Sequence, residues 1–275
     1  MATRLRLPLT LLYSNVGKPL PALEVGYRMM KRLSLRSFSD AHPYKLISVD
    51  PNEINKVSNP AKEWWSIPGE VVGGDWDRQS VSIEDEIVFK TISNHIKRGE
   101  PLAVDAYREY YHKHMGTWAQ QGWGETFQER CEQISSLISR IEEHGFRTQR
   151  ELFETTDSVD LKRQNNDSIH PLLNEIRVDI DRDGGFHFWR CGSHRLAIAQ
   201  ALELPTIPVL VGTRHDQWQH LRDRYNTAIQ SGEDLQPFNE LCNHPDLLEF
   251  NDQSNEIRAP VAGPNVKNAP TDPSM

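Results

Sequence analysis

The sequence predicts a mixed α/β (α+β) fold, in which a small mixed sheet carries flanking helices and a helical insertion. Two short strand-like runs, 176–180 and 186–189, are separated by a glycine turn at 183–185, which is typical of a β-hairpin. An Ala- and Leu-rich segment follows at helical spacing over 196–202, and an apolar strand returns over 204–212. Together these observations predict a strand–strand–helix–strand unit.

The turn into this helix carries the residues that point to chemistry. Gly192 allows a sharp bend and Ser193 suits an N-cap, so a helix should begin within a residue or two of Ser193. The first amides of a helix have no internal partner and carry the positive end of its dipole, so they favour an anion. Arg195 can add a forked contact and His194 a further hydrogen bond. The sequence therefore predicts a phosphate site at Gly192, Ser193, His194 and Arg195.

These residues resemble the ParB/sulfiredoxin-like superfamily, including its ParB N-terminal-like nuclease and nucleotide-binding domains. The shared features are the Gly192-Ser193-His194-Arg195 turn, the helix that follows and the Ile207-Pro208-Val209 strand. In the family this turn binds CTP in ParB-type partition proteins, ATP in sulfiredoxin and ADP in free-serine kinases. Sulfiredoxin has Cys at the position of Ser193. The resemblance extends loosely over residues 42–219 and makes this chain a divergent member.

The resemblance implies a function. We expect a nucleotide-binding protein that takes ATP, ADP or CTP, with Mg²⁺, and acts as a phosphotransferase or a nucleotide hydrolase. By resemblance to the serine kinases, the acceptor would be a small hydroxyl-bearing substrate. The alternative is a nucleotide-gated module that binds DNA or a protein partner without turnover.

A second constellation supplies carboxylates. Asp75 and Asp77 follow the glycine pair Gly73-Gly74, and two carboxylates beside a flexible backbone can hold Mg²⁺ or act as a catalytic base. We therefore expect Asp75, Asp77 and His194 as catalytic candidates. The same segment also suits a turn stabilised by Asp side chains, with Trp76 packed on the core. Glu175 and Arg177, on the strand that leads into the hairpin, are expected to face the same cleft.

Helical patterns flank this core. The insertion spans about 83–154, where a helical stripe is expected to end at Gly145 and a short helix to begin at the Thr148 cap. A further helix over 215–232 should close the domain, with Gly232 as its stop. An aromatic-rich stretch at 107–123 either forms core or covers a nucleotide base.

Composition limits the remaining possibilities. The 275-residue chain has a net charge of −8, but residues 1–36 hold seven basic residues against Glu24 alone. We expect a partly helical basic arm over 1–41, which either docks on a protein surface or binds a polyanion such as DNA. The domain proper spans 42–232. The tail over 233–275 should be largely disordered after about 250. Three cysteines without paired spacing and the lack of a long apolar run predict a cytoplasmic protein with no transmembrane segment.

Overall fold

The fold comes from a computed structural model, which describes residues 31–32, 37–58, 68–119, 126–155, 174–189 and 191–251. Most of the basic arm and the tail beyond residue 251 lie outside the described residues, so the expectations for them stay predictions. The chain divides into two compact units, Met1–Leu221 and Arg222–Met275. No helix among the described residues is both long and apolar enough to cross a membrane.

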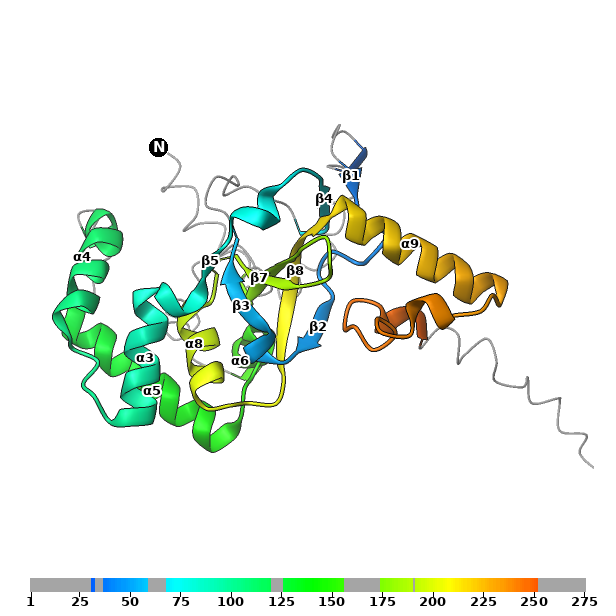
Figure 1. The fold of residues 1–275 in the computed structure, drawn as a ribbon. Helices are drawn as coiled ribbons and strands as arrows, with labels where there is room; N and C mark the ends of the chain where they lie inside the picture. Colours follow the sequence, from blue (N-terminus) through cyan, green and yellow to red (C-terminus); the bar gives the residue numbers. More distant parts are fainter. Residues whose placement is uncertain are drawn as a thin grey trace, which may run out of the picture. The chain divides into compact units, whose positions relative to one another are not determined.

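The first unit confirms the predicted mixed α/β fold and contains an eight-stranded sheet within its described residues (Figure 1). The strands run in the order β1-β4-β8-β6-β7-β3-β5, with β2 also paired to β8. In chain order the strands are β1 (Ser37–Phe38), β2 (Leu46–Val49), β3 (Ile54–Val57), β4 (Glu70–Val72), β5 (Val81–Ser82), β6 (Arg177–Ile180), β7 (Phe186–Phe188) and β8 (Ile207–His215).

Helices follow the sequence patterns closely. The α-helices are α3 (Ile87–Arg98), α4 (Asp105–Ala119), α5 (Phe127–His144), α6 (Gln149–Thr155), α8 (Ser193–Ala201) and α9 (Asp216–Ser231). Short 3₁₀ turns are η1 (Pro51–Glu53), η2 (Trp76–Gln79), η3 (Ile83–Asp85) and η5 (Gln236–Phe238). The predicted stop at Gly145 and the Thr148 cap are both present. The cap of α8 is Gly192 rather than Ser193, because its left-handed φ of 82° makes the bend directly before the helix.

The strand–strand–helix–strand unit forms the centre of the sheet. β6 pairs antiparallel with β7 and parallel with β8, and α8 makes the crossover between them. One sheet face is apolar and is covered by α3 and α8, which lie side by side (Figure 1). Phe188 on that face meets Phe89 of α3 at a ring-centroid distance of 5.7 Å. The core therefore lies between this face and the two helices.

The other face of β6 differs from the sequence expectation. The apolar–polar alternation over 176–180 is typical of a half-buried strand, yet all four residues of β6 are buried. Arg177 and Asp179 alternate with Val178 and Ile180, so they point to the face opposite α8. The expectation is wrong because the polar side chains are buried in contacts within the protein.

The second unit is held by a buried arginine of α9. Arg222 donates to the Asp246 carbonyl and to the Glu249 carboxylate, and its guanidinium lies over the Phe250 ring at 4.5 Å. Tyr225 OH donates to Asn251 Oδ1 at 2.6 Å. The segment after α9 is thus tied to that helix by charge-assisted bonds and aromatic packing.

The turn of the β6–β7 hairpin tolerates no side chain at Gly184. Its φ is +92°, and an added Cβ would lie 2.6 Å from the buried Trp218 ring. We expect Gly184→Ala to lower the free energy of unfolding by about 3 kcal/mol, from left-handed strain and overpacking. Gly99 has φ +69° but open space around its Cα. Gly99→Ala should therefore cost only about 1 kcal/mol in urea unfolding, and equal losses would contradict this account.

Candidate functional site

The N-terminus of α8 presents unpaired hydrogen-bond donors. Gly192 caps the helix without a side-chain bond, and the first backbone bond runs from Leu196 N to Gly192 O at 3.0 Å. Glycine is required at this cap because a Cβ would lie 2.9 Å from Ile176 Cγ1. Within the described part of the chain, no hydrogen bond engages the Ser193 amide, the Ser193 hydroxyl or the His194 amide. These three groups can bind an anion.

The His194 side chain binds residues of α4 and α5. Its Nδ1 accepts from Arg130 Nη2 at 3.3 Å, so Nε2 carries the proton and donates to Tyr107 OH at 2.7 Å. Burial, followed by the charge of Arg130, lowers the pKa of His194 to about 3. The imidazole is therefore neutral and engaged by α4 and α5, which leaves only its backbone amide for a ligand.

Arg195 also has partners inside the protein. Its Nη1 lies 3.2 Å from Glu175 Oε2, its Nη2 donates to the Arg147 carbonyl at 2.6 Å, and its guanidinium lies 4.5 Å from the Phe146 ring centre. Glu175 in turn accepts from Gln149 N at 2.7 Å, at the start of α6. Burial raises the pKa of Glu175, and the charge of Arg195 opposes that shift. This pair fastens α8 to α6.

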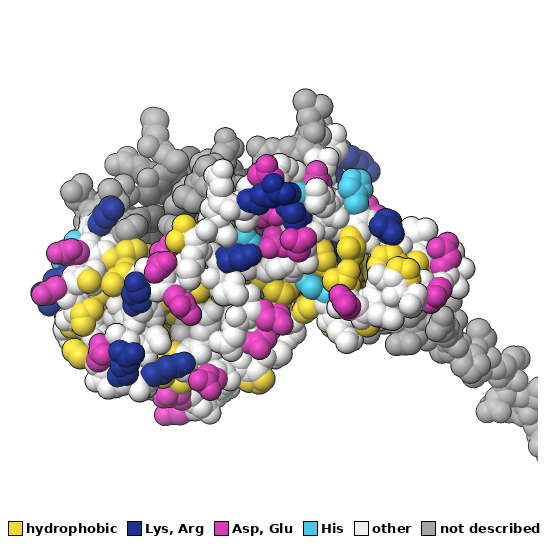
Figure 2. Space-filling model, in the orientation of Figure 1, with side chains coloured by type: hydrophobic (Ala, Val, Ile, Leu, Met, Phe, Trp, Pro, Cys, Tyr) yellow, Lys and Arg dark blue, Asp and Glu magenta, His cyan; other side chains and the backbone are white. Residues whose placement is uncertain are grey.

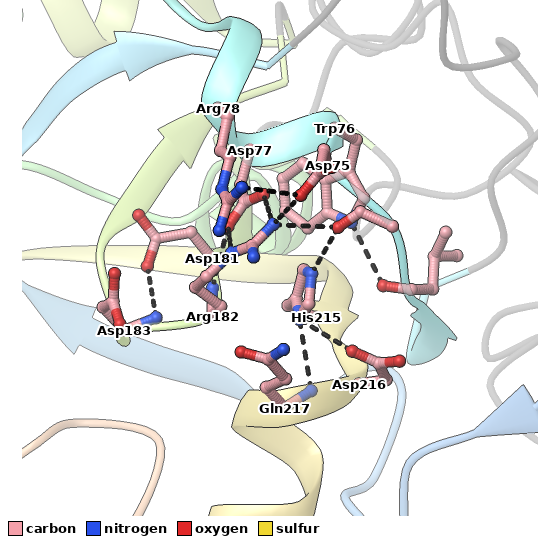
Figure 3. A network of polar contacts seen from close by, with 12 residues as sticks. Asp75, Trp76, Asp77, Arg78, Asp181, Arg182, Asp183, His215, Asp216 and Gln217 are labelled. Atoms are coloured by element: carbon pink, nitrogen blue, oxygen red, sulfur yellow. Dashed lines mark hydrogen bonds and ion pairs between the residues drawn. The ribbon is translucent and has the colours of Figure 1, made fainter.

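The two carboxylates of the Gly73-Gly74 segment bind an arginine. Arg182 donates to Asp77 through Nε at 2.7 Å and Nη2 at 2.6 Å, and to Asp75 Oδ1 through Nη2 at 2.8 Å (Figure 3). The Arg182 side-chain bond is the main cause that lowers the pKa of Asp77 well below its ordinary value, against burial. No group of three or more residues suited to hold a metal occurs among the residues described. Both carboxylates are therefore occupied by Arg182, and Asp75 makes no capping bond to its own turn.

The structure does not bring the carboxylates together with the turn at Gly192. Arg182, which holds Asp75 and Asp77, lies in the closed turn of the β6–β7 hairpin, whereas Gly192 contacts Ile176 at the open end. The four residues of β6 separate these ends by about 13 Å, at about 3.3 Å per residue. Side chains from the two ends therefore do not converge on one reacting atom.

Sequence reasoning missed a polar sheet face, defined here as Glu70, Arg177, Asp179, His187 and Thr213. All five residues are buried. They lie on neighbouring strands: Asp179 pairs with His187, Glu70 pairs with Thr213, and Thr213 N donates to Asp179 Oδ1 at 2.8 Å. Ser58 Oγ donates to Asp179 Oδ2 at 2.8 Å. The polar positions of 176–180 were the available signal, but their burial depends on distant strands.

Arg177 belongs to this face rather than to the opening at α8. Its guanidinium lies 4.3 Å from the Trp189 ring centre, and its Nε would lie 2.6 Å from a Cβ on Gly212. Glycine at 212 thus makes room for the arginine. Glu175 and Arg177 thus have different partners, and the expectation that they face one cleft stays a prediction.

Comparison with known proteins adds no relative: no family model, no curated protein and no solved structure matches the chain. The function is therefore inferred from the arrangement of side chains and backbone groups.

We expect Arg195→Ala to destabilise the fold by about 3–5 kcal/mol, because it leaves Glu175 buried without its ion pair. Arg140 is exposed, so Arg140→Ala should change the free energy of unfolding by less than about 0.5 kcal/mol. Thermal and urea unfolding measure both. A fully stable Arg195→Ala protein that loses ligand binding would show instead that the guanidinium serves the ligand.

The Asp77–Arg182 pair should make the fold acid-sensitive. The pKa of Asp77 in the folded protein lies below its ordinary value of 3.8. The stabilisation from the ion pair is therefore present above that pH and is lost as the pH falls below it. Asp77→Asn should cost about 2 kcal/mol at pH 7 and flatten the loss of stability below about pH 4. Asp85, which is exposed and 3.7 Å from Lys90, provides the matched Asp→Asn control. An unchanged acid limb in Asp77→Asn would refute the assignment.

Proposed function

We propose that this chain binds the phosphate group of a nucleotide, ATP, ADP or CTP, at the N-terminus of α8. The observation that carries the proposal is the trio of unpaired donors at Ser193 and His194 after the left-handed Gly192. Phosphate oxygens accept hydrogen bonds from such amides and gain from the helix dipole as well. The resemblance of the Gly192–Arg195 turn to ParB/sulfiredoxin-like proteins supports the same ligand class.

Local charge strengthens the site. Arg130 reaches the His194 ring from α5, so a cationic group lies beside the first turn of α8. The imidazole is neutral, so Arg130 supplies this charge alone and His194 adds none. Acidic and basic side chains are intermixed over the described residues of the face drawn in Figure 2. The described residues of that face show no large patch of a single charge sign. A phosphate would therefore be recognised by a few nearby groups and not by a broad charged surface.

The geometry favours nucleotide binding without turnover over hydrolysis or phosphoryl transfer by Asp75 and Asp77. Hydrolysis or phosphoryl transfer needs a metal or a base within reach of the transferred group. The two carboxylates are ion-paired to Arg182 at the other end of the hairpin. The chain would then act as a nucleotide-gated module towards DNA or a protein partner. Lys31 donates to the Ser39 carbonyl at 3.2 Å, a contact within the basic arm.

Calorimetric titration with ATP, ADP and CTP, with and without Mg²⁺, tests the proposal. Ser193→Ala removes one donor and should weaken binding about tenfold, whereas Ser193→Glu places a charge at the anion site and should abolish it. Gln128→Glu adds the same charge to the first turn of α5, where Thr126 and Glu129 already form a capping box. This control should bind like the wild-type protein.

Two results would overturn the proposal. One is nucleotide binding that Ser193→Glu leaves intact; the other is an absence of binding by all three nucleotides to the folded protein. Phosphate release is followed in the same samples. A third result is phosphate release by the wild-type protein, with Asp75→Asn and Asp77→Asn proteins that bind nucleotide without releasing it. That result would make the chain an enzyme rather than a binding module.

A further inference from the structure

His187 stands at the centre of the polar sheet face. It pairs with Asp179 on β6 and with Lys56 on β3, and its side chain is fully buried. Its Nε2 lies 3.0 Å from Asp181 Oδ2. His187 takes no part in the phosphate site at the N-terminus of α8.

The partner of Nε2 fixes the tautomer of His187. Burial tends to raise the pKa of Asp181, but hydrogen bonds from His187, Gly185 and Asp183 outweigh it and leave that pKa lowered. Asp181 is therefore a carboxylate that accepts a hydrogen bond from Nε2–H. In the neutral ring the other nitrogen, Nδ1, carries a lone pair and acts as an acceptor.

That acceptor has no donor. In the described part of the chain neither His187 Nδ1 nor Thr213 Oγ1 has a hydrogen-bond partner, although both atoms are buried. Buried polar atoms without partners are uncommon because they lose their bonds to water. A histidine aligned by a carboxylate, with its second nitrogen open, is also the arrangement that prepares an imidazole to receive a proton or a hydrogen bond.

Trp76 covers this histidine. Its ring meets His187 edge-on at a centroid distance of 5.8 Å. The same ring lies 5.8 Å from that of His215, and its Nε1 donates to the Val72 carbonyl at 3.1 Å (Figure 3). The indole is itself partly exposed. Gly74, just before it, has φ +91° and open space around its Cα. The cover therefore follows a glycine that can accommodate a change in backbone direction.

We propose that His187 Nδ1, on the sheet face opposite α8, is the hydrogen-bond acceptor of a second ligand site that takes a small neutral alcohol beneath Trp76. The site is separate from the phosphate site and does not depend on it.

Charge decides this ligand class. The two carboxylates beside the histidine are Asp179, its partner on β6, and Asp181, which binds its Nε2. The opposing cations are Arg177, which interacts with Asp179, and the half-exposed Lys56, 3.8 Å from Asp181. The two signs balance, so neither an anion nor a cation gains a net attraction there. A neutral O–H donor matches both the lone pair and the charge.

Histidine ¹⁵N NMR on the intact protein tests the proposal, with His187→Gln used to assign the signal. We expect the Nε2–H tautomer for His187. Glycerol and ethylene glycol, as neutral alcohol probes, should move its Nδ1 resonance upfield in a saturable manner. Dimethyl sulfoxide, which accepts but cannot donate, should leave it in place. The ring nitrogens of His194 already have protein partners and serve as an internal control.

Trp76→Ala removes the indole that covers the site. The apparent dissociation constant of both probes should then fall by about tenfold or more, the range for one hydrogen bond gained without displacing the indole. A response seen only in Trp76→Ala also supports the site, with Trp76 as its closure. No shift in either protein overturns the proposal. An equal shift of all histidine resonances, or an equal shift with dimethyl sulfoxide, also overturns the proposal, because either result shows an adventitious additive only. If Trp76→Ala fails to fold, the wild-type titration decides alone.

Discussion

The structure depends on one constraint: β6 is buried on both faces although its sequence is half polar. A charged side chain inside a protein must find partners there, since water is not available to it. Asp179 therefore binds Ser58 Oγ and the Thr213 amide, and Arg177 lies over Trp189. These contacts connect β6 to chain segments on both sides of it in the sheet. The same strand holds the two ends of the hairpin apart, and that separation determines which groups can meet a common ligand.

Local patterns predicted the elements, because each depends on a few neighbouring residues. The hairpin follows from its glycine turn, α5 from its apolar stripe, and the start of α8 from Gly192. The partners of the charged residues could not be predicted in this way. Arg182 and Asp77 are 105 positions apart, and Ser58 and Asp179 are 121 apart. No spacing rule relates such residues, so Asp75 and Asp77 suited a metal site in the sequence and an ion pair in the structure. For the same reason the burial of β6 on its polar face was missed.

Arginine shows why a motif residue need not contact the ligand. Arg195 lies in the predicted phosphate turn, yet its guanidinium binds Glu175 and the Arg147 carbonyl. A planar, permanently charged group with five donors can join two elements more firmly than a single hydrogen bond can. Arg182 has the same role between the hairpin turn and the Gly73-Gly74 segment. What remains open at α8 is backbone and one hydroxyl. The specificity of such a site depends on the position of the helix end, which Arg195 itself fixes.

The two proposed sites differ in electrostatic sense, and the sheet explains the difference. At α8 the unpaired groups are donors at the positive end of a helix dipole, so they favour a phosphate. On the polar sheet face the described atoms without a hydrogen-bond partner include the Nδ1 of His187 and the Thr213 hydroxyl, and Arg177 and Lys56 balance the charges of Asp179 and Asp181. A strand carries almost no net dipole, so that face has no counterpart of the helix end. A phosphate therefore suits the α8 site, whereas a neutral alcohol suits the His187 site. A protein with both sites could bind a phosphate compound and an alcohol at the same time without confusing them.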